Sequence, residues 1–183
     1  MSSSSRCASR RREWLLAAAA LALPAAWAQA TGLPELPGWT QRRQASLRTL
    51  GFRIYDVALW SPEPVAAAAW DTQALALALT YARAFEGRLL AERSLTEMRR
   101  QGPLDEALAQ RWLKAMSDAF PDVSEGDRLT GRHDPQRGAR FWFNGEPRGS
   151  VDDAAFSRRF FGIWLSPQTS EPGLRGRLLG LAP

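Results

Sequence analysis

The sequence predicts an α+β fold in which helices pack against an antiparallel sheet. Segments with alternating apolar residues, which are typical of strands, come in groups rather than singly between helices. Two segments of helical character follow the first group of strands, and two more close the chain after the second group. A parallel sheet would instead require regular alternation of strands and helices. The length of 183 residues fits one domain with an ordinary core.

The first strands are expected after a lead-in rich in Pro and Gly, Thr31–Gly38. Trp39–Arg48 is polar and fits an edge strand. Phe52–Trp60 alternates between two faces and predicts a strand, which Ser61–Pro64 ends. Ala74–Arg83 is rich in Ala and Leu, which favour helices, but its strict period of two predicts a third strand.

Two helices are predicted next, over Phe85–Gln101 and Leu104–Phe120. Gly102-Pro103 separates them, and the first helix ends with two arginines, which suits the helix dipole. Asp127–His133 and Ala139–Asn144 then read as two strands joined by a short turn. These two strands extend the sheet after the helical pair.

The closing segments are predicted to be helices over Val151–Leu165 and Pro172–Leu181. Asp152 and Asp153 stand in the first turn of the former, where helix capping explains them better than paired catalytic carboxylates do. His133 adjoins a turn and is expected at the surface.

Residues 1–30 have the pattern of an export signal. Four arginines precede an apolar run, Trp14–Trp27, and an A-x-A pattern ends at residue 30. Cleavage before Thr31 would leave a mature domain of residues 31–183, located in the periplasm or secreted. The run is short for a transmembrane helix and Pro24 breaks it, so no stable transmembrane segment is expected after cleavage. An uncleaved anchor is the alternative, and the Sec and twin-arginine routes both stay open.

Composition excludes several functional classes. The formal net charge is +5, but residues 1–30 hold four Arg and one Glu, so the mature chain carries only +2. Its arginines are scattered among acidic residues, which argues against a nucleic-acid partner. With one Cys and one His, and no phosphate-binding or dinucleotide glycine pattern, the sequence predicts no metal site and no cofactor. It indicates no particular protein partner.

Several motifs resemble landmarks of the chalcone isomerase-like family, in particular its exported bacterial branch. The motifs, in order, are Leu47-Arg48, Phe52–Trp60, Gly126–Leu129, Phe141–Gly145, Phe160–Leu165 and Leu174–Gly180. The resemblance covers most of the mature chain. It implies a curved antiparallel sheet covered on one face by helices, an open-faced sandwich with a cleft between the two layers.

The resemblance implies two activities for this cleft. Plant enzymes of the family cyclise a chalcone to a flavanone without a cofactor, and a non-catalytic branch binds fatty acids through an Arg and a Tyr. Arg48 stands where the cleft Arg of the family is expected. Tyr55 stands where the plant enzyme has a Thr, and this departure favours acid binding over isomerisation.

Four residues are therefore candidates for ligand binding. Arg48 would clamp a carboxylate, because guanidinium binds it in a bidentate manner, and Tyr55 would donate a second hydrogen bond. Arg53 shares a predicted strand face with Tyr55 and is the rival clamp, while Tyr81 ends a leucine stripe that points toward the same cleft. The alternative for each arginine is a solvated surface position, and the alternative for each tyrosine is a place in the core.

The sequence thus favours non-catalytic binding of a small apolar acid such as a fatty acid. One alternative is a cofactor-free isomerase of the chalcone isomerase type, which would act on a small aromatic substrate. The second is a structural or partner-binding envelope protein whose cleft is filled. No catalytic residue is assigned.

Overall fold

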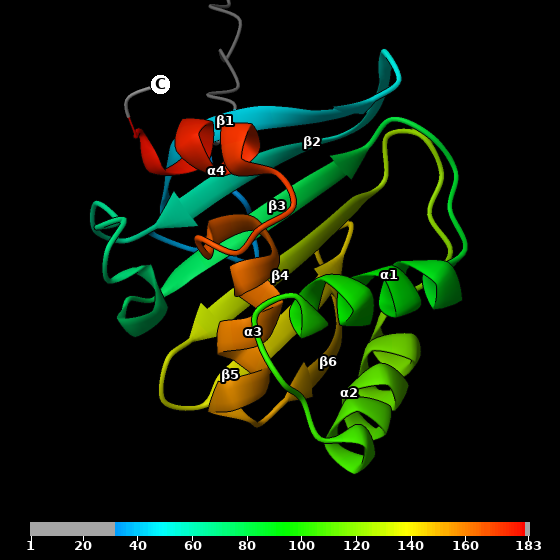
Figure 1. The fold of residues 1–183 in the computed structure, drawn as a ribbon. Helices are drawn as coiled ribbons and strands as arrows, with labels where there is room; N and C mark the ends of the chain where they lie inside the picture. The colour runs from blue at the N-terminus through cyan, green and yellow to red at the C-terminus, as the bar shows by residue number, and fades with distance from the viewer. Residues whose placement is uncertain (1–31, 182–183) are drawn as a thin grey trace, which may run out of the picture.

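The computed structural model describes residues 32–181, in which six antiparallel strands form one open, curled sheet (Figure 1). Each strand pairs with the next one along the chain, so the sheet is a meander. The strands are β1 (Thr40–Thr49), β2 (Phe52–Ser61), β3 (Leu75–Tyr81), β4 (Arg128–Asp134), β5 (Gly138–Phe143) and β6 (Glu146–Val151). The predicted signal and its cleavage site lie outside the described residues.

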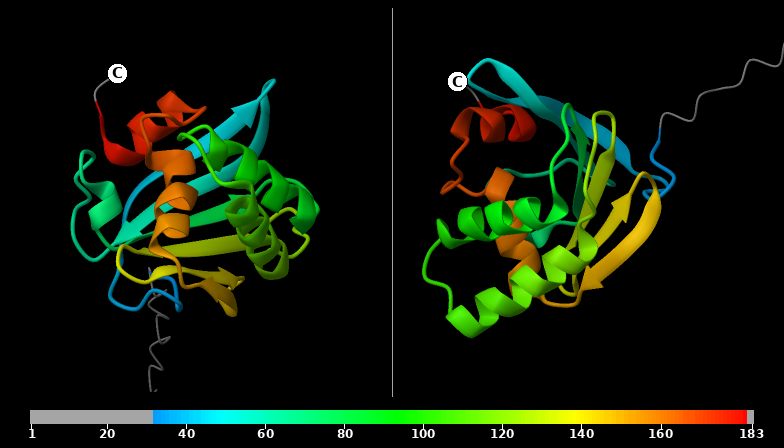
Figure 2. Two further views of the ribbon diagram at one scale, coloured as in Figure 1. Left: turned by 60° about the horizontal axis from the view of Figure 1, so that its bottom comes forward. Right: turned by 90° about the vertical axis from the view of Figure 1, so that its right-hand side faces the viewer.

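Four helices form a layer on one face of the sheet (Figure 2). The helices are α1 (Gly87–Arg99), α2 (Glu106–Ala119), α3 (Ala154–Leu165) and α4 (Pro172–Leu179). A short 3₁₀ turn, η1 (Trp70–Thr72), lies between β2 and β3. This arrangement confirms the α+β class and the one-sided helical cover that the resemblance implied.

Strand β3 forms because both of its faces find apolar partners. Leu75, Leu77 and Leu79 are buried in the main core, on the side of the helices. Ala76 and Ala78 are buried on the other side, in a second cluster with Leu36 and Trp60. Tertiary burial thus outweighs the helix propensity of Ala and Leu, and the strand prediction is confirmed.

Strand β6 was not predicted, because its sequence carries little strand signal. The segment Glu146–Val151 contains Pro147 and Gly149, and its side chains are exposed except for the half-buried Val151. Pro is tolerated there because β6 is an edge strand, where a missing backbone donor can face solvent. Consequently Val151 ends a strand, and helix α3 begins three residues later than predicted.

Asp153 caps helix α3, as predicted. Its carboxylate accepts hydrogen bonds from the backbone N–H groups of Ala155 and Phe156, at 2.8 and 3.0 Å. Its second oxygen accepts from Nε1 of Trp112 at 2.9 Å, which ties the start of α3 to α2. The cap therefore fixes both the first turn of α3 and its packing.

The surface position expected for His133 is wrong. Its side chain is fully buried, because it lies on the helix-facing side of β4, where it contacts Phe161. Its Nε2 lies 3.1 Å from the carbonyl oxygen of Asp71, and its Nδ1 lies 2.6 Å from Oγ of Ser157. Since a carbonyl only accepts, Nε2 carries the proton and Nδ1 accepts from the Ser157 hydroxyl.

Burial lowers the pKa of His133 below its ordinary value. The stabilisation by neutral His133 is thus fully present above about pH 6.5, the unfolded-state pKa, and is lost as the pH falls through the lower folded-state pKa. We expect the free energy of unfolding to decrease from pH 7.5 to pH 5. Urea titrations should show a weaker pH dependence for His133→Gln, and equal pH slopes in both proteins would contradict the prediction.

Candidate functional site

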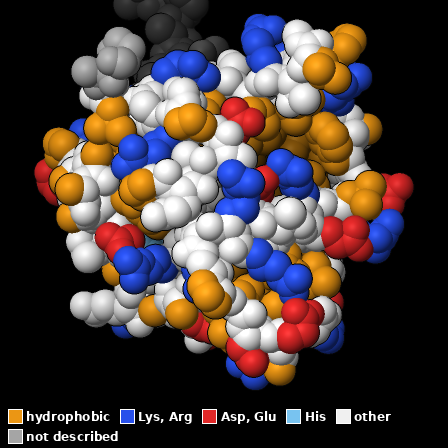
Figure 3. Space-filling model, viewed as in Figure 1, with side chains coloured by type: hydrophobic (Ala, Val, Ile, Leu, Met, Phe, Trp, Pro, Cys, Tyr) orange, Lys and Arg blue, Asp and Glu red, His pale blue; other side chains and the backbone are white. Residues whose placement is uncertain are grey.

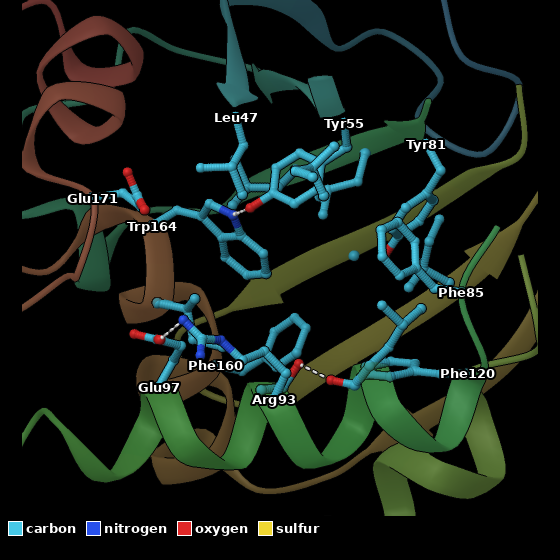
Figure 4. Close-up of a pocket in the computed structure, with 18 of the residues that line it drawn as sticks. Leu47, Tyr55, Tyr81, Phe85, Arg93, Glu97, Phe120, Phe160, Trp164 and Glu171 are labelled. Atoms are coloured by element: carbon cyan, nitrogen blue, oxygen red, sulfur yellow. Dashed lines mark hydrogen bonds and ion pairs between the residues drawn. The ribbon is translucent and has the colours of Figure 1, made fainter. Parts of the chain in front are cut away.

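A cavity of about 500 Å³ lies between the sheet and the helices. Figure 4 shows side chains from β1, β2, β3, α1 and α3 around it, and Figure 3 shows apolar side chains in a hollow between the β1–β2 hairpin and α1. Its wall is mainly apolar, and includes Leu47, Ile54, Leu77, Leu79, Leu89, Leu90, Phe120, Leu129, Phe141, Phe160 and Trp164. The volume is typical of pockets that hold small ligands.

The cavity exists because α1 packs against α2 and α3 rather than directly on the sheet. Helix α3 fills the other end of the helix-facing side with aromatic rings. Phe156, Phe160 and Phe161 lie there against Phe141 of β5 and His133 of β4. Near the β1–β2 hairpin no such rings reach the sheet from α1, so the space above Tyr55 and Leu79 stays open.

Two tyrosines on neighbouring strands place hydroxyl groups at the cavity. Tyr55 and Tyr81 are register partners across β2 and β3, and their ring centroids are 6.0 Å apart. Trp164 Nε1 donates to the Tyr55 hydroxyl oxygen at 2.9 Å, which leaves the proton of that hydroxyl free to donate. The Tyr81 hydroxyl makes no hydrogen bond within residues 32–181, although the residue is 5% exposed.

Both phenols stay protonated at physiological pH. Burial raises the pKa of Tyr55 to about 12, against a smaller lowering by its hydrogen bond from Trp164. Burial also raises the pKa of Tyr81, and the neighbouring Tyr55 adds to the effect. The pair is therefore a source of two neutral O–H donors, suited to a carbonyl or carboxylate oxygen.

An ion pair on α1 and the carboxylate of Glu171 contribute the charged part of the wall. Arg93 Nη2 lies 2.6 Å from Oε1 of Glu97, whose side chain is only 7% exposed. The other carboxylate oxygen, Oε2, lies 3.5 Å from Nε of Arg100 and makes no hydrogen bond within the described residues. Two guanidinium groups therefore share one carboxylate, and Arg93 retains N–H donors for a second anion.

The structure brings two of the four candidate residues to the cavity and places the other two outside it. Tyr55 and Tyr81 line the wall. Leu47 and Thr49 also line it, and strand alternation turns Arg48 between them to the other side, where it is exposed.

Arg53 is separated from the cavity by an irregularity in the hairpin. The register of β1 and β2 shifts between Leu47 and Arg48, opposite Ile54, so the alternation that put Arg53 on the Tyr55 face is interrupted. Arg53 is half exposed and pairs with Asp56 at 3.2 Å. The charged residues of the wall, Arg93, Glu97 and Glu171, were missed. The spacing of four between Arg93 and Glu97 places these two on one helix face with Leu90.

The described part of the chain, residues 32–181, holds no cluster of three or more His, Cys, Asp or Glu side chains that would ligate a metal ion. Nor does it contain a helix with the length and apolar character needed to cross a membrane. The chemistry of the described site therefore rests on two phenols, the Arg93–Glu97 ion pair, the Glu171 carboxylate and apolar surface.

An antiparallel sheet that encloses an apolar cavity under a layer of helices defines an open-faced α+β sandwich with an internal pocket. Residues 43–180 match the model of the chalcone isomerase-like family, and the chain belongs to that family. The family identified from the sequence motifs is thus confirmed.

Two similar proteins extend this result. An uncharacterized protein of Haemophilus influenzae is 32% identical over 129 residues, which cover 70% of this chain and 62% of that protein, less than two thirds of its length. The crystal structure of a fatty-acid binding protein of Arabidopsis thaliana matches with a TM-score of 0.54 and 14% identity. That match covers 78% of this chain and 84% of the plant protein, and at this identity it shows the shared fold.

Proposed function

We propose that the protein binds a small apolar acid of the fatty-acid type in its cavity, without transforming it, after export to the periplasm. The observation that carries this proposal is the cavity of about 500 Å³, whose wall is apolar except for a few polar groups. Burial of an acyl chain against this wall is favourable by about 0.8 kcal/mol per methylene group. The fatty-acid binding protein with the same fold supports this choice of ligand class.

The acid group would bind at the polar groups of the wall. Tyr55 and Tyr81 offer protonated hydroxyls, and Arg93, which lines the cavity although its side chain is 71% exposed, offers positive charge for a carboxylate at the solvent-exposed edge of the wall. Because Glu97 already pairs with Arg93, the ligand carboxylate would share the guanidinium with it while Arg100 compensates Glu97 from the other side. This assignment moves the clamp from Arg48, which the sequence favoured, to Arg93.

Native mass spectrometry of protein recovered from the periplasmic fraction tests the proposal. We expect a chain that begins at Thr31 and carries a species with the mass of a fatty acid. Arg93→Gln should weaken retention by up to about fivefold, since an ion pair of a largely exposed arginine contributes at most about 1 kcal/mol. Tyr55→Phe should weaken it by a similar factor, since it removes one hydrogen bond.

Arg48→Gln is the matched control, because it removes an arginine that lies outside the wall. Its affinity for an added fatty acid should equal that of the wild type. Loss of the ligand in Arg48→Gln but not in Arg93→Gln would return the clamp to the residue predicted from the sequence. Wild-type protein without any ligand, and without affinity for added fatty acids, would refute the binding function.

A cofactor-free isomerase is the second candidate. The observation that favours it is the Tyr55–Tyr81 pair, because two adjacent O–H donors can polarise a carbonyl group. Turnover of a chalcone by the wild type, lost in Tyr55→Phe, would establish it over the binding function. The cavity itself argues against the third expectation, an envelope protein with a filled cleft.

A further inference from the structure

Exposed apolar side chains gather at the opening of the cavity. Among residues 32–181, four large apolar side chains are exposed. Two of them, Leu50 and Phe52, lie at the end of the β1–β2 hairpin, which contributes to the cavity wall, and a third is Leu89 of α1. Leu89 and Thr49, the neighbour of Leu50, belong to the cavity wall itself. The exposed fractions of Leu50 and Phe52 are 92% and 62%, so the tip of the β1–β2 hairpin presents two large apolar groups to solvent.

The residue choice at this tip is unfavourable for the free protein. Leu50 and Gly51 form the two-residue hairpin loop, and both have positive φ, 51° and 83°. Asn, Asp or Gly are the usual residues at the first of these positions, because a side chain such as that of Leu is strained there. Leucine is therefore unfavourable at this position for two reasons: its backbone conformation is strained, and its apolar side chain is exposed to water.

Three arginines surround the same tip. Arg48 and Arg53 are register partners across the hairpin, although like charges in this position repel each other. Arg83 follows the end of β3, and its guanidinium carbon lies 5.2 Å above the ring of Phe52. Within residues 32–181 only Arg53 of the three forms an ion pair, with Asp56. An anionic surface would relieve this repulsion.

We propose that this tip, formed by Arg48, Leu50, Phe52, Arg53 and Arg83, docks on the surface of an anionic phospholipid bilayer and brings the cavity opening to the lipid. The apolar side chains enter the interface while the arginines contact lipid phosphates, the arrangement that basic and apolar groups adopt at membrane surfaces. An apolar acid then passes between bilayer and cavity without crossing water. This transfer of an acid rests on the proposed function, but the docking itself does not require a bound ligand.

A bilayer fits the tip better than a protein or nucleic acid does. The patch is small, convex and located on a hairpin end, whereas a protein interface needs a broad complementary surface. It also lacks the row of basic residues that follows a nucleic-acid backbone. Thr49, which adjoins the tip, and Leu89 both belong to the wall of the apolar cavity. An apolar partner explains why the tip lies next to this cavity.

An environment-sensitive bimane label at position 50 tests the proposal. The label is attached to Leu50→Cys in the full chain that also carries Cys7→Ser, and phosphatidylglycerol vesicles are added. We expect a blue shift of the emission, which phosphatidylcholine vesicles and high salt reduce. The same label at Lys114→Cys, on the exposed side of α2 away from the hairpin, should show no shift. No shift at position 50, or equal shifts at both positions, overturns the proposal.

The arginines are tested by the double variant Arg48→Gln/Arg83→Gln in the same labelled protein. Its vesicle partition coefficient should fall about 25-fold, since each arginine near an anionic surface contributes about fivefold. Arg137→Gln/Arg140→Gln removes the same charge from exposed positions around the β4–β5 turn and serves as the control. Equal losses in the two variants would mean attraction by net charge alone and overturn the docking surface.

A protein that retains an acid but does not contact vesicles would overturn the docking surface and leave the binding function standing.

Discussion

Leu79→Trp is expected to abolish retention of the acyl ligand while the protein stays folded. Leu79 lies on β3 with its side chain in the cavity wall, so the larger indole extends into open space rather than into packed core. An indole that excludes four methylene groups of a ligand removes about 3 kcal/mol of binding free energy, which corresponds to more than 100-fold in affinity. Native mass spectrometry should show the ligand-free mass.

The control for this variant is Thr80→Trp. Thr80 is the next residue of β3, and it is exposed on the opposite face of the sheet. A tryptophan there leaves the cavity unchanged, so the ligand should be retained. Thermal unfolding of both variants shows whether overpacking has disturbed the fold. A folded Leu79→Trp protein that still carries the ligand would place the ligand outside the cavity.

The sheet was largely predictable because strand alternation is a local signal. The pattern of Phe52–Trp60 and of Ala74–Arg83 predicted two neighbouring strands, and the same alternation turned Tyr55 and Tyr81 toward one side. Strand β6 lacked this signal, since an edge strand needs few apolar residues. His133 was misplaced because its neighbour in sequence is a turn, whereas its neighbours in space are Ser157 and Phe161 of α3.

The charged part of the site depends on tertiary packing that no local pattern records. Arg93 reaches the cavity because α2 and α3 hold α1 away from the sheet. In the sequence alone, Arg93 and Glu97 are an ordinary pair on a helix surface. Arg48 had the support of the family resemblance, but strand alternation turns it away from the wall, and one irregularity in the β1–β2 register turns Arg53 away as well. Side-chain direction at a bulge follows from the pairing of both strands, which is known only once the hairpin has formed.

Phe160→Ala is expected to lower the free energy of unfolding by about 3–5 kcal/mol, the range for truncation of a buried phenylalanine. Phe160 is the centre of the aromatic packing between α3 and the sheet. Its ring centroid lies 5.2–5.8 Å from those of five aromatic neighbours, namely Phe120, Phe141, Phe156, Phe161 and Trp164. Urea unfolding measures the loss, and Phe160→Leu, which keeps most of the apolar volume, should lose clearly less. Equal losses in the two variants would contradict a packing role.

The same substitution should change which ligand the protein retains. Phe160 separates the cavity from the aromatic core, so truncation to alanine lengthens the space available beyond Tyr55 and Leu79. A longer acyl chain then fills the added volume and recovers part of the lost burial, which makes the variant more stable with a long acid than with a short one. Thermal unfolding with acids of increasing chain length measures this. If wild type and Phe160→Ala are stabilised most by the same chain length, then Phe160 does not form the end of the ligand site, and the acyl chain must run along another part of the wall.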